Sequence, residues 1–495
     1  MKKISCILCA AVLGLCGAAA DFPAEMPVCA AEHTASAGMT WAIDSEGTLT
    51  ISGSGPMDYN GFCGTLQLDE LPFEPVEWYS QRESIKKVVI EDGITSICWF
   101  AFHQCCNLKE IEIPDSVTEI GIYPFYGCES LEHLHIPACM TSISDKAFFG
   151  CKSLVSIDVP DHITSIGDNA FCGCASLASI EIPETVTSIG EGAFDGCTSL
   201  TGITIPKNVT SIGEKAFWTC TSLKTITLPE GIAEIGYLMF DGCESLTEIT
   251  IPESVTTIGE SAFCGCKSLK SLVIPESVTN IGDKTFWNCE GLTEIQLPKQ
   301  ITRIGEYAFY DCAALRAIAI PEQVTEIGDC AFRGCDSLKT ITFPESVAAI
   351  GTEALGYCHN LEQIVIKNPD CVLGENVLLC SDGTIYGCEG SAVQAYAESH
   401  EYSFAPLSAL PAQASETGDF DGDGRIGAED AQNVLTVYAS ILAGNDPALT
   451  DVQKKAADVD NNGAVDVTDA QYILIYYVEN YVTGNPTSWE TVVRK

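Results

Sequence analysis

A cysteine returns every 23 residues along most of this 495-residue chain, and this spacing constrains the fold more than any other feature. Prolines keep the same step from Pro114 to Pro344, and phenylalanines keep it from Phe102 to Phe332. A fixed period of this length is typical of a repeat array in which each unit stacks on its neighbours. The residues of this cysteine column are Cys105, Cys128, Cys151, Cys174, Cys197, Cys220, Cys243, Cys266, Cys289, Cys312, Cys335 and Cys358.

One repeat unit reads LTEITIPESVTTIGESAFCGCKS, and its pattern predicts a small coil. Ile249 and Ile251 alternate around an exposed threonine, which predicts a short strand with one buried face. Pro252 ends that strand because proline has no N–H to donate. A tight turn at Gly259 and a short helical turn carrying Phe263 would complete the coil. A single unit cannot bury its own apolar face but stacked units can, so we expect an α/β repeat solenoid with parallel strands.

An acidic residue follows the turn glycine in most coils, and two interpretations of this acid column remain open. The column could bind cations, or each carboxylate could stabilise the positive end of a short helix; the second is favoured. The residues are Asp168, Glu191, Glu214, Glu260, Asp283, Glu306 and Asp329.

These repeats resemble the BspA-like class of leucine-rich repeats over residues 90–366, some twelve coils. The resemblance implies a right-handed solenoid used in adhesion and in protein or glycan binding, not in catalysis. Residues 38–89 resemble the β-rich N-terminal cap of such arrays, and residues 367–404 resemble a closing cap. Caps are needed because the end coils would otherwise expose their apolar faces.

The 26 cysteines could form disulfides in an exported chain, but their periodicity argues against it. Equivalent side chains of stacked coils point the same way, which is poor disulfide geometry. We therefore expect buried thiols in the core, and infer an anaerobic or weakly oxidising habitat. Cys371, Cys380 and Cys388 lie outside the column, and their pairing stays open.

Other candidate chemistry is sparse. His133 and His135 could share a strand face, but no third metal ligand is evident, so surface histidines are the favoured interpretation. No nucleophile–histidine–acid grouping or glycine-rich phosphate loop is visible, and repeat or cap accounts for residues 90–404, so the sequence predicts no enzyme. A net charge of −43 argues against binding to nucleic acid or anionic membranes.

The place after each repeat phenylalanine holds an aromatic residue in several coils. Trp218, Trp287 and Tyr310 could form a row that stacks on sugars or on a partner's side chains. The alternative, which is favoured, is that these rings only fill the edges of the coils.

Two calcium loops follow a Pro/Ala-rich linker at 405–416. Loop places 1, 3, 5 and 12 supply side-chain oxygens, and place 7 supplies a backbone carbonyl. In the first loop these places are Asp419, Asp421, Asp423, Asp430 and Arg425. In the second loop they are Asp458, Asp460, Asn462, Asp469 and Ala464, with Asp466 adding a side chain at place 9. Two full copies 39 residues apart predict two bound Ca²⁺ ions.

Residues 417–484 resemble a type I dockerin, a small all-α module of two EF-hand-like loop–helix units, and 485–495 would be a tail. The helices are expected at 428–442 and 467–481. Their apolar residues should form a small core, including Val434, Leu435, Ile441, Ile473 and Leu474. Calcium should then supply much of the folding energy.

The dockerin resemblance implies a cohesin as partner, contacted through loop places 10 and 11 of one repeat. Those places hold Ala428 and Glu429 in the first repeat, and Val467 and Thr468 in the second. The two pairs differ, which argues against the symmetric two-way binding that some dockerins show.

The N-terminus, residues 1–31, is expected to be a signal peptide cleaved after residue 20 or after 30 or 31. Lys2 and Lys3 precede an apolar stretch that is short for a membrane span, although an N-terminal anchor is the alternative. No later segment is apolar and long enough to span a bilayer, so we expect a secreted protein.

Two functions remain open. The first is a non-catalytic binding or adhesion subunit that docks to a cohesin of a cellulosome-like complex and assists polysaccharide breakdown, as the resemblance to dockerins implies. The second is a structural or host-contact protein whose solenoid binds another protein.

Overall fold

The computed structural model describes residues 39–57, 76, 78–121, 123–136, 140–410, 417–420, 426–444, 447, 449, 451–482 and 488–493. The expected signal peptide at 1–31 lies outside these residues, as does the linker segment 411–416. Within them, no helix has both the length and the apolar character that crossing a membrane requires. The chain divides into two compact units, the second of which includes everything after residue 383.

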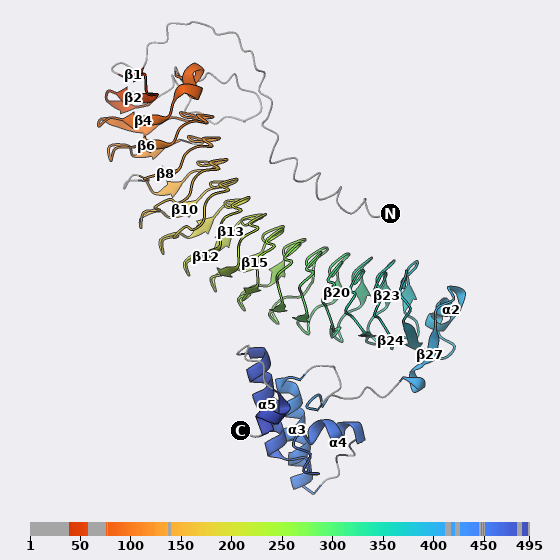
Figure 1. Ribbon diagram of the computed structural model, residues 1–495. Helices are drawn as coiled ribbons and strands as arrows, with labels where there is room; N and C mark the ends of the chain where they lie inside the picture. The colour runs from red at the N-terminus through yellow and green to blue at the C-terminus, as the bar shows by residue number, and fades with distance from the viewer. Residues whose placement is uncertain are drawn as a thin grey trace. The chain divides into compact units, whose positions relative to one another are not determined.

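The repeats form a parallel-strand β-solenoid of about 14 turns. Figure 1 shows the strands of successive coils lying side by side. Their register follows the sequence period, since Ser165 pairs with Ser188 and Ile166 with Ile189, 23 residues on. The predicted parallel solenoid is therefore confirmed.

Each coil contributes to one or both of two strand columns. The first column comprises β4 (Lys87–Ile90), β6 (Glu110–Glu112), β8 (His133–Leu134), β12 (Gly202–Thr204), β14 (Thr225–Thr227), β16 (Glu248–Ile249), β18 (Ser271–Val273), β19 (Glu294–Gln296), β22 (Thr340–Phe343), β24 (Gln363–Ile366), β26 (Thr384–Gly387) and β27 (Phe404–Pro406). The second comprises β5 (Ile94–Ile97), β7 (Glu119–Ile120), β9 (Ser142–Ile143), β10 (Ser165–Ile166), β11 (Ser188–Ile189), β13 (Ser211–Ile212), β15 (Glu234–Ile235), β17 (Thr257–Ile258), β20 (Arg303–Ile304), β21 (Glu326–Ile327), β23 (Ala349–Ile350) and β25 (Val372–Leu373).

The N-terminal end begins with an antiparallel hairpin of β1 (Thr40–Ile43) and β2 (Thr48–Ser52), whose second strand pairs in parallel with β4. Two further elements of this end are β3 (Gly55–Pro56), which pairs with β5, and the 3₁₀ helix η1 (Tyr79–Ser84).

The interior of the coil differs from the prediction in one respect. The short helical turn expected after Gly259 is a run of turns, and the described coils contain no helix there. Ser261 has a left-handed φ of 57°, and this conformation interrupts a helix after one residue. Equivalent residues in other coils, such as Lys215 and Lys284, do the same.

Stacked phenylalanines and buried cysteines form the core. Rings of the phenylalanine column, from Phe102 to Phe332, stack with centroids 5.3 to 5.7 Å apart. The column cysteines are free and buried, as predicted. From Cys128 on, each Sγ donates to the carbonyl of the phenylalanine 26 residues earlier, as Cys220 does to Phe194 at 3.1 Å. Burial raises the pKa of these thiols, to about 12 at Cys289.

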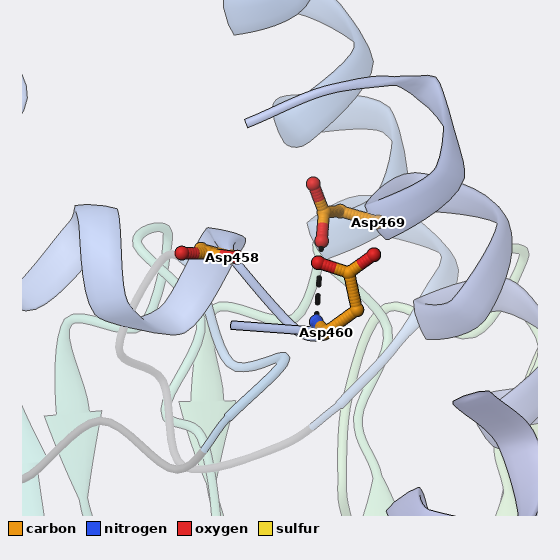
Figure 2. Close-up of side chains that lie close together, drawn as sticks. All are labelled: Asp458, Asp460 and Asp469. Carbon is orange, nitrogen blue, oxygen red and sulfur yellow. Dashed lines mark hydrogen bonds between the residues drawn. The ribbon is translucent and has the colours of Figure 1, made fainter. Parts of the chain in front are cut away.

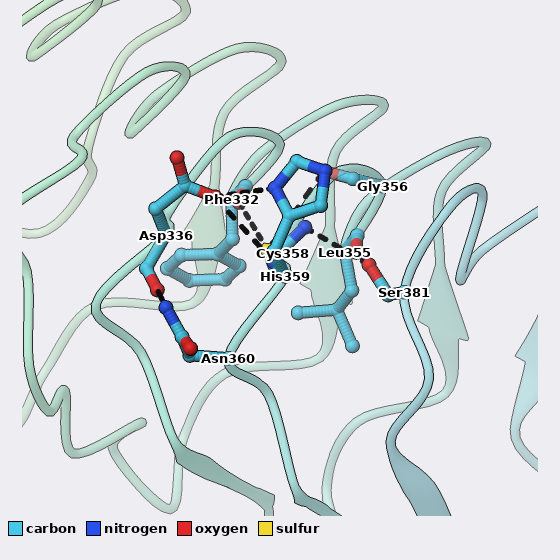
Figure 3. Close-up of polar contacts among 8 residues, drawn as sticks. All are labelled: Phe332, Asp336, Leu355, Gly356, Cys358, His359, Asn360 and Ser381. Carbon is cyan, nitrogen blue, oxygen red and sulfur yellow. Dashed lines mark hydrogen bonds and ion pairs between the residues drawn. The ribbon is translucent and has the colours of Figure 1, made fainter.

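Where the column ends, a hydroxyl replaces the thiol (Figure 3). Ser381 stands 23 residues after Cys358, and its Oγ donates to the carbonyl of Leu355 at 2.8 Å. The N–H of Cys358 donates to the same Oγ at 2.9 Å. The place therefore requires a small side chain that can donate to a buried carbonyl, and cysteine and serine both do so.

Aspartates of the acid column form hydrogen bonds between coils, a role that neither interpretation predicted. Asp168 accepts the backbone N–H of Glu191, 23 residues on, at 2.8 Å, and Asp283 does the same for Glu306. Glutamates of the column instead pair with lysines, as Glu191 does with Lys215 at 2.9 Å. The aspartates thus hold adjacent coils together through backbone hydrogen bonds.

The second unit contains the α-helices of the described chain, together with two shorter helical segments. They are α2 (Ala392–Ser399), η2 (Leu407–Ala409), α3 (Ala428–Leu442), α4 (Asp451–Ala457), α5 (Val467–Tyr477), the π-helical η3 (Val478–Val482) and α6 (Trp489–Val493). A small core joins α3, α4 and α5 through Phe420, Ile426, Ala431, Val434, Val437, Ala457, Val459, Ala470 and Ile473, and Trp489 and Val493 of α6 pack against it.

Candidate functional site

Two buried aspartates, one in the first turn of α3 and one in the first turn of α5, organise the candidate calcium site. Asp430 accepts the N–H of Phe420 at 2.8 Å and the N–H of Gly427 at 2.7 Å, one on each carboxylate oxygen. Asp469 does the same for Val459 and Asp466, at 2.8 and 2.9 Å. Each carboxylate therefore joins the beginning of its loop to the start of the following helix.

Three carboxylates converge in the second loop (Figure 2). Asp458, Asp460 and Asp469 each offer an oxygen, and these oxygens lie within 4.8 Å of one another. Oxygen ligands at 2.3–2.6 Å from one Ca²⁺ are separated by at most about 5 Å, so this set fits a calcium ion. Asp469 is fully buried, and this desolvation raises its pKa, so a bound cation would stabilise its ionised form.

The backbone of the second loop is arranged around the same side chains. Asp458 accepts the N–H groups of Asn462 and Gly463, both at 2.9 Å, and Gly463 has the left-handed φ of 87° expected for the bend at place 6. Asp466 lies outside the converging group, because its carboxylate accepts the N–H of Thr468 and caps α5. Asn462 donates through Nδ2 to Asp460 and accepts the N–H of Ala464.

The first loop is described only at its ends. Asp421, Asp423 and Arg425 lie outside the described residues. Asp419 and Asp430 are 4% and 3% exposed, so both ends of this loop are buried, whereas in the second loop Asp469 is buried and Asp458 is half-buried.

The predicted core of the two helices needs a correction. Val434 and Ile473 are fully buried, but Leu435, Ile441 and Leu474 are 38 to 45% exposed. Neighbouring positions on a helix are about 100° apart, so the whole apolar run cannot face inward. The outward residues leave an apolar surface on each helix, which is typical of a partner-binding face.

The exposed faces of α3 and α5 are related by the 39-residue offset between the loops. Four exposed residues follow helical spacing from the start of α5 into η3; we call them the α5 face, and they are Val467, Gln471 and Leu474 of α5 and Val478, the first residue of η3. The equivalent α3 face comprises Ala428, Gln432, Leu435 and Ala439, which are exposed as well. Both carry glutamine and leucine at the same places, but valines on α5 replace alanines on α3. The α5 face is therefore the more apolar of the two.

Trp218, Trp287 and Tyr310 are each half-buried, and the structure separates these three residues that were predicted to form a row. Trp218 donates from Nε1 to Asp241 at 3.1 Å, and within the described part of the chain its ring contacts neither Trp287 nor Tyr310. Trp287 and Tyr310 do contact each other, with centroids 5.5 Å apart.

Three residues that the sequence did not single out extend this pair. Tyr307 stacks on Trp287 at 5.8 Å, and the guanidinium of Arg333 lies 5.6 Å from the ring centroid of Tyr310 and 4.5 Å from that of Tyr357. We call Trp287, Tyr307, Tyr310, Arg333 and Tyr357 the aromatic cluster. Only the stacking of coils brings these five residues together.

Comparisons with known families match most of the chain. The family described as BspA type leucine-rich repeat region matches residues 76–201, 141–270 and 257–382. The dockerin type I domain matches residues 417–479. No curated protein matches the chain.

Among solved structures, a leucine-rich repeat protein from Bacteroides ovatus is 28% identical, with a TM-score of 0.45. A leucine-rich cell surface protein from Faecalibacterium prausnitzii is also 28% identical, with a TM-score of 0.42. Each alignment covers 67% of this chain and 93% of the other.

Proposed function

The chain belongs to the BspA-type leucine-rich-repeat family and carries a type I dockerin domain, and from these two memberships we propose that it is a secreted, non-catalytic binding subunit. Both modules are binding modules, and a dockerin implies a cohesin as partner. In this proposal the dockerin attaches the chain to a cohesin of a cellulosome-like extracellular complex. The solenoid holds a ligand there, in support of polysaccharide breakdown.

The observation that carries the docking proposal is the α5 face, which begins at Val467, place 10 of the second calcium loop. Val467 is 41% exposed, Leu474 45% and Val478 37%, in a chain whose net charge is −43. Exposed apolar side chains at such regular spacing cost solubility unless they are covered by a partner. We therefore propose the α5 face, together with the neighbouring Thr468, as the cohesin contact, and calcium as the ion that holds this helix in place.

Calcium binding within this proposal uses the residues already described. Type I dockerins generally bind calcium. We propose one ion in each loop, held in the second by Asp458, Asp460 and Asp469 with Asn462 and the carbonyl of Ala464. A bound ion would neutralise the loop carboxylates and fix the angle at which α5 leaves the loop.

Calorimetric titration of the full-length protein with type I cohesins, in calcium and again in excess chelator, tests the docking proposal. We expect binding only with calcium, and a loss of at least about tenfold in affinity for Leu474→Arg, because a charge would be buried in the contact. Leu435→Arg is the matched control at the equivalent place on α3 and should leave affinity nearly unchanged. If only the α3 variant lost cohesin affinity, the contact would lie on the α3 face instead. If neither variant lost affinity, both faces would be refuted as the contact.

The aromatic cluster favours a protein as the ligand of the solenoid, which is the alternative function. Trp287 and Tyr307 cover each other's ring faces, and the faces of Tyr310 and Tyr357 are turned toward Arg333. Sugars stack on free ring faces, whereas Tyr, Trp and Arg together are typical of protein contacts.

A glycan array and a pull-down with the full-length protein and its Trp287→Ala variant separate the two ligand classes. Sugar binding that is lost in Trp287→Ala, or in Trp218→Ala, would favour the glycan. Capture of a defined protein that depends on Trp287 and Arg333 would favour adhesion.

A further inference from the structure

An asparagine followed by a glycine stands at an exposed bend of the second calcium loop. Asn462 and Gly463 are both exposed, and so are the residues on either side of them. A Cβ on Gly463 would meet no atom within 4 Å, so nothing packs against this bend. The backbone at this point therefore has room to change its conformation, and water reaches it.

These two residues contain both partners of an intramolecular reaction, the conversion of an asparagine into a cyclic succinimide. The backbone nitrogen of Gly463 is the nucleophile, and Cγ of the Asn462 amide is the carbon that it attacks. The two atoms belong to adjacent residues, so ring closure needs only rotation about the Cα–Cβ and Cα–C bonds of Asn462. Glycine favours this closure, because a Cβ on the attacking residue would crowd the new ring.

Hydrogen bonds of the loop hold the groups that this cyclisation uses. The N–H of Gly463 donates to Oδ2 of Asp458 at 2.9 Å, so a carboxylate lies where the departing proton goes. The N–H of Ala464 donates to Oδ1 of Asn462 at 2.8 Å, which stabilises the negative charge that develops on this oxygen. The leaving nitrogen, Nδ2, donates to Asp460 at 3.0 Å. The loop therefore positions both a proton acceptor and an oxyanion donor for the reaction.

We propose that Asn462 is a site of spontaneous deamidation, and that calcium binding to the second loop protects it. In the first step the bond between Gly463 N and Asn462 Cγ forms and the bond from Cγ to Nδ2 breaks. The amide nitrogen leaves as ammonia, which carries the proton that Gly463 N has lost. In the second step one water molecule opens the succinimide at either carbonyl. The products are aspartate, or isoaspartate, in which the backbone runs through the former side chain.

Protection by calcium follows because ion binding and deamidation use the same groups. Asp458 and the side-chain oxygen of Asn462 are among the ligands proposed for the second ion, so they are no longer available to the reaction when that ion is bound. Metal binding also orders the loop, which prevents the rotation that ring closure needs. This protection rests on the proposed calcium binding, whereas the reaction itself does not.

The two products change the loop differently. Aspartate at position 462 makes place 5 the same as in the first loop, where Asp423 stands. Isoaspartate inserts a methylene into the backbone just before Gly463, which displaces the bend and the carbonyl of Ala464 from the other ligands. A chain that loses calcium for long would therefore lose its second calcium loop irreversibly.

Peptide mass mapping of the full-length protein tests the site, after incubation at mildly alkaline pH in excess chelator or in saturating calcium. In chelator we expect the mass change from amide to acid at Asn462, at least as fast as in a free peptide of residues 457–467. In calcium the same change should be at least about tenfold slower, because only the chain without the ion reacts. Asn461→Asp, at place 4 of the loop, is the control and should leave both rates unchanged.

Calcium uptake provides a second readout. The chain aged in chelator should lose calcium capacity in proportion to its isoaspartate content, measured with an isoaspartyl methyltransferase, whereas fresh Asn462→Asp should keep the native capacity. An Asn462 that stays intact in chelator while the free peptide converts would overturn the proposal. Equal rates in calcium and in chelator would overturn the protection. Calorimetry of the fresh chain then shows whether the second ion binds at all, which separates this failure from a failure of the proposed calcium site.

Discussion

At the scale of single residues, Asp195 is a carboxylate that is buried away from water, and this burial disfavours its charged form. It is 6% exposed and accepts hydrogen bonds from Thr219 Oγ1 at 3.1 Å and Cys172 Sγ at 3.5 Å. Burial raises its pKa from 3.8 to about 6. The folded chain therefore keeps this proton at pH values where the unfolded chain has lost it.

This difference predicts how Asp195→Asn changes stability with pH. Between about pH 4 and pH 6 the native state binds more protons than the unfolded state, so native stability falls as pH rises, and the full cost remains above pH 6. Asparagine carries no charge to bury, so the variant should be more stable than the native chain by roughly 1–3 kcal/mol at pH 7.5, but not at pH 4. Urea unfolding at the two pH values measures this difference. Asp161→Asn, at an exposed place, is the control, and an equal difference at both pH values would contradict the argument.

The sequence alone correctly predicted part of the structure at this scale, namely the state of the column cysteines. The 23-residue period indicated buried, unpaired cysteines because equivalent side chains point the same way. It could not show that each thiol donates to a phenylalanine carbonyl 26 residues earlier, as Cys197 does to Phe171. That bond depends on the pitch of the coil, which no single unit specifies.

At the scale of elements, the sequence predicted the strands of the first strand column but not the strands of the second. Ile249 and Ile251 alternate with polar residues over enough positions to indicate a strand. Thr257–Ile258 is two residues long, and such a segment becomes a strand only when its neighbour 23 residues back is present to pair with it. Likewise, the sequence alone did not show which residues of α3 and α5 face outward, because this depends on how the two helices pack.

The sequence predicted a tail at residues 485–495, but the structure has the helix α6 there, at Trp489–Val493. Trp489 stacks on Tyr476 with centroids 4.0 Å apart, and Val492 is fully buried. At the other end of the module, a Cβ on Gly418 would lie 2.5 Å from Trp489 Cζ2. The first and last described segments of the module therefore pack on each other.

From this packing we expect Trp489→Ala to destabilise the calcium-loaded dockerin by roughly 2–4 kcal/mol, because a large ring is removed from a contact between two segments. The midpoint of the calcium-dependent thermal transition of the full-length protein measures the effect. Glu490→Ala, exposed on the same helix, should leave that midpoint unchanged. A similar midpoint in both variants would mean that α6 is not part of the folded module.

At the scale of the whole molecule, the sequence predicted two kinds of architecture in one chain, and each is stabilised differently. The solenoid buries long columns of apolar side chains through contacts between neighbouring coils. The helical module is short, with a core of nine buried apolar residues and two buried aspartates in its calcium loops, so much of its folding energy should come from metal binding. The repeat and the loop motifs were visible in sequence because both have fixed spacings. The outer surfaces were not, because they join residues from different coils or from different helices.

This contrast predicts two thermal transitions for the full-length protein, only one of which depends on calcium. Ligand that binds the folded state alone stabilises it by RT ln(1 + [L]/Kd), or about 2.7 kcal/mol at a hundredfold excess over Kd. Calcium should therefore raise the midpoint of the dockerin transition, and a chelator should abolish that shift without moving the solenoid transition.

Differential scanning calorimetry with Asp458→Ala/Asp460→Ala should show the calcium shift reduced, because one loop has lost two of its converging ligands. Asp168→Ala, which removes the acceptor of the Glu191 N–H, should lower the solenoid transition alone and leave the calcium shift intact. A solenoid transition that moved with calcium would instead place metal in the coils, and would return the acid column to the cation-binding interpretation that its hydrogen bonds argue against.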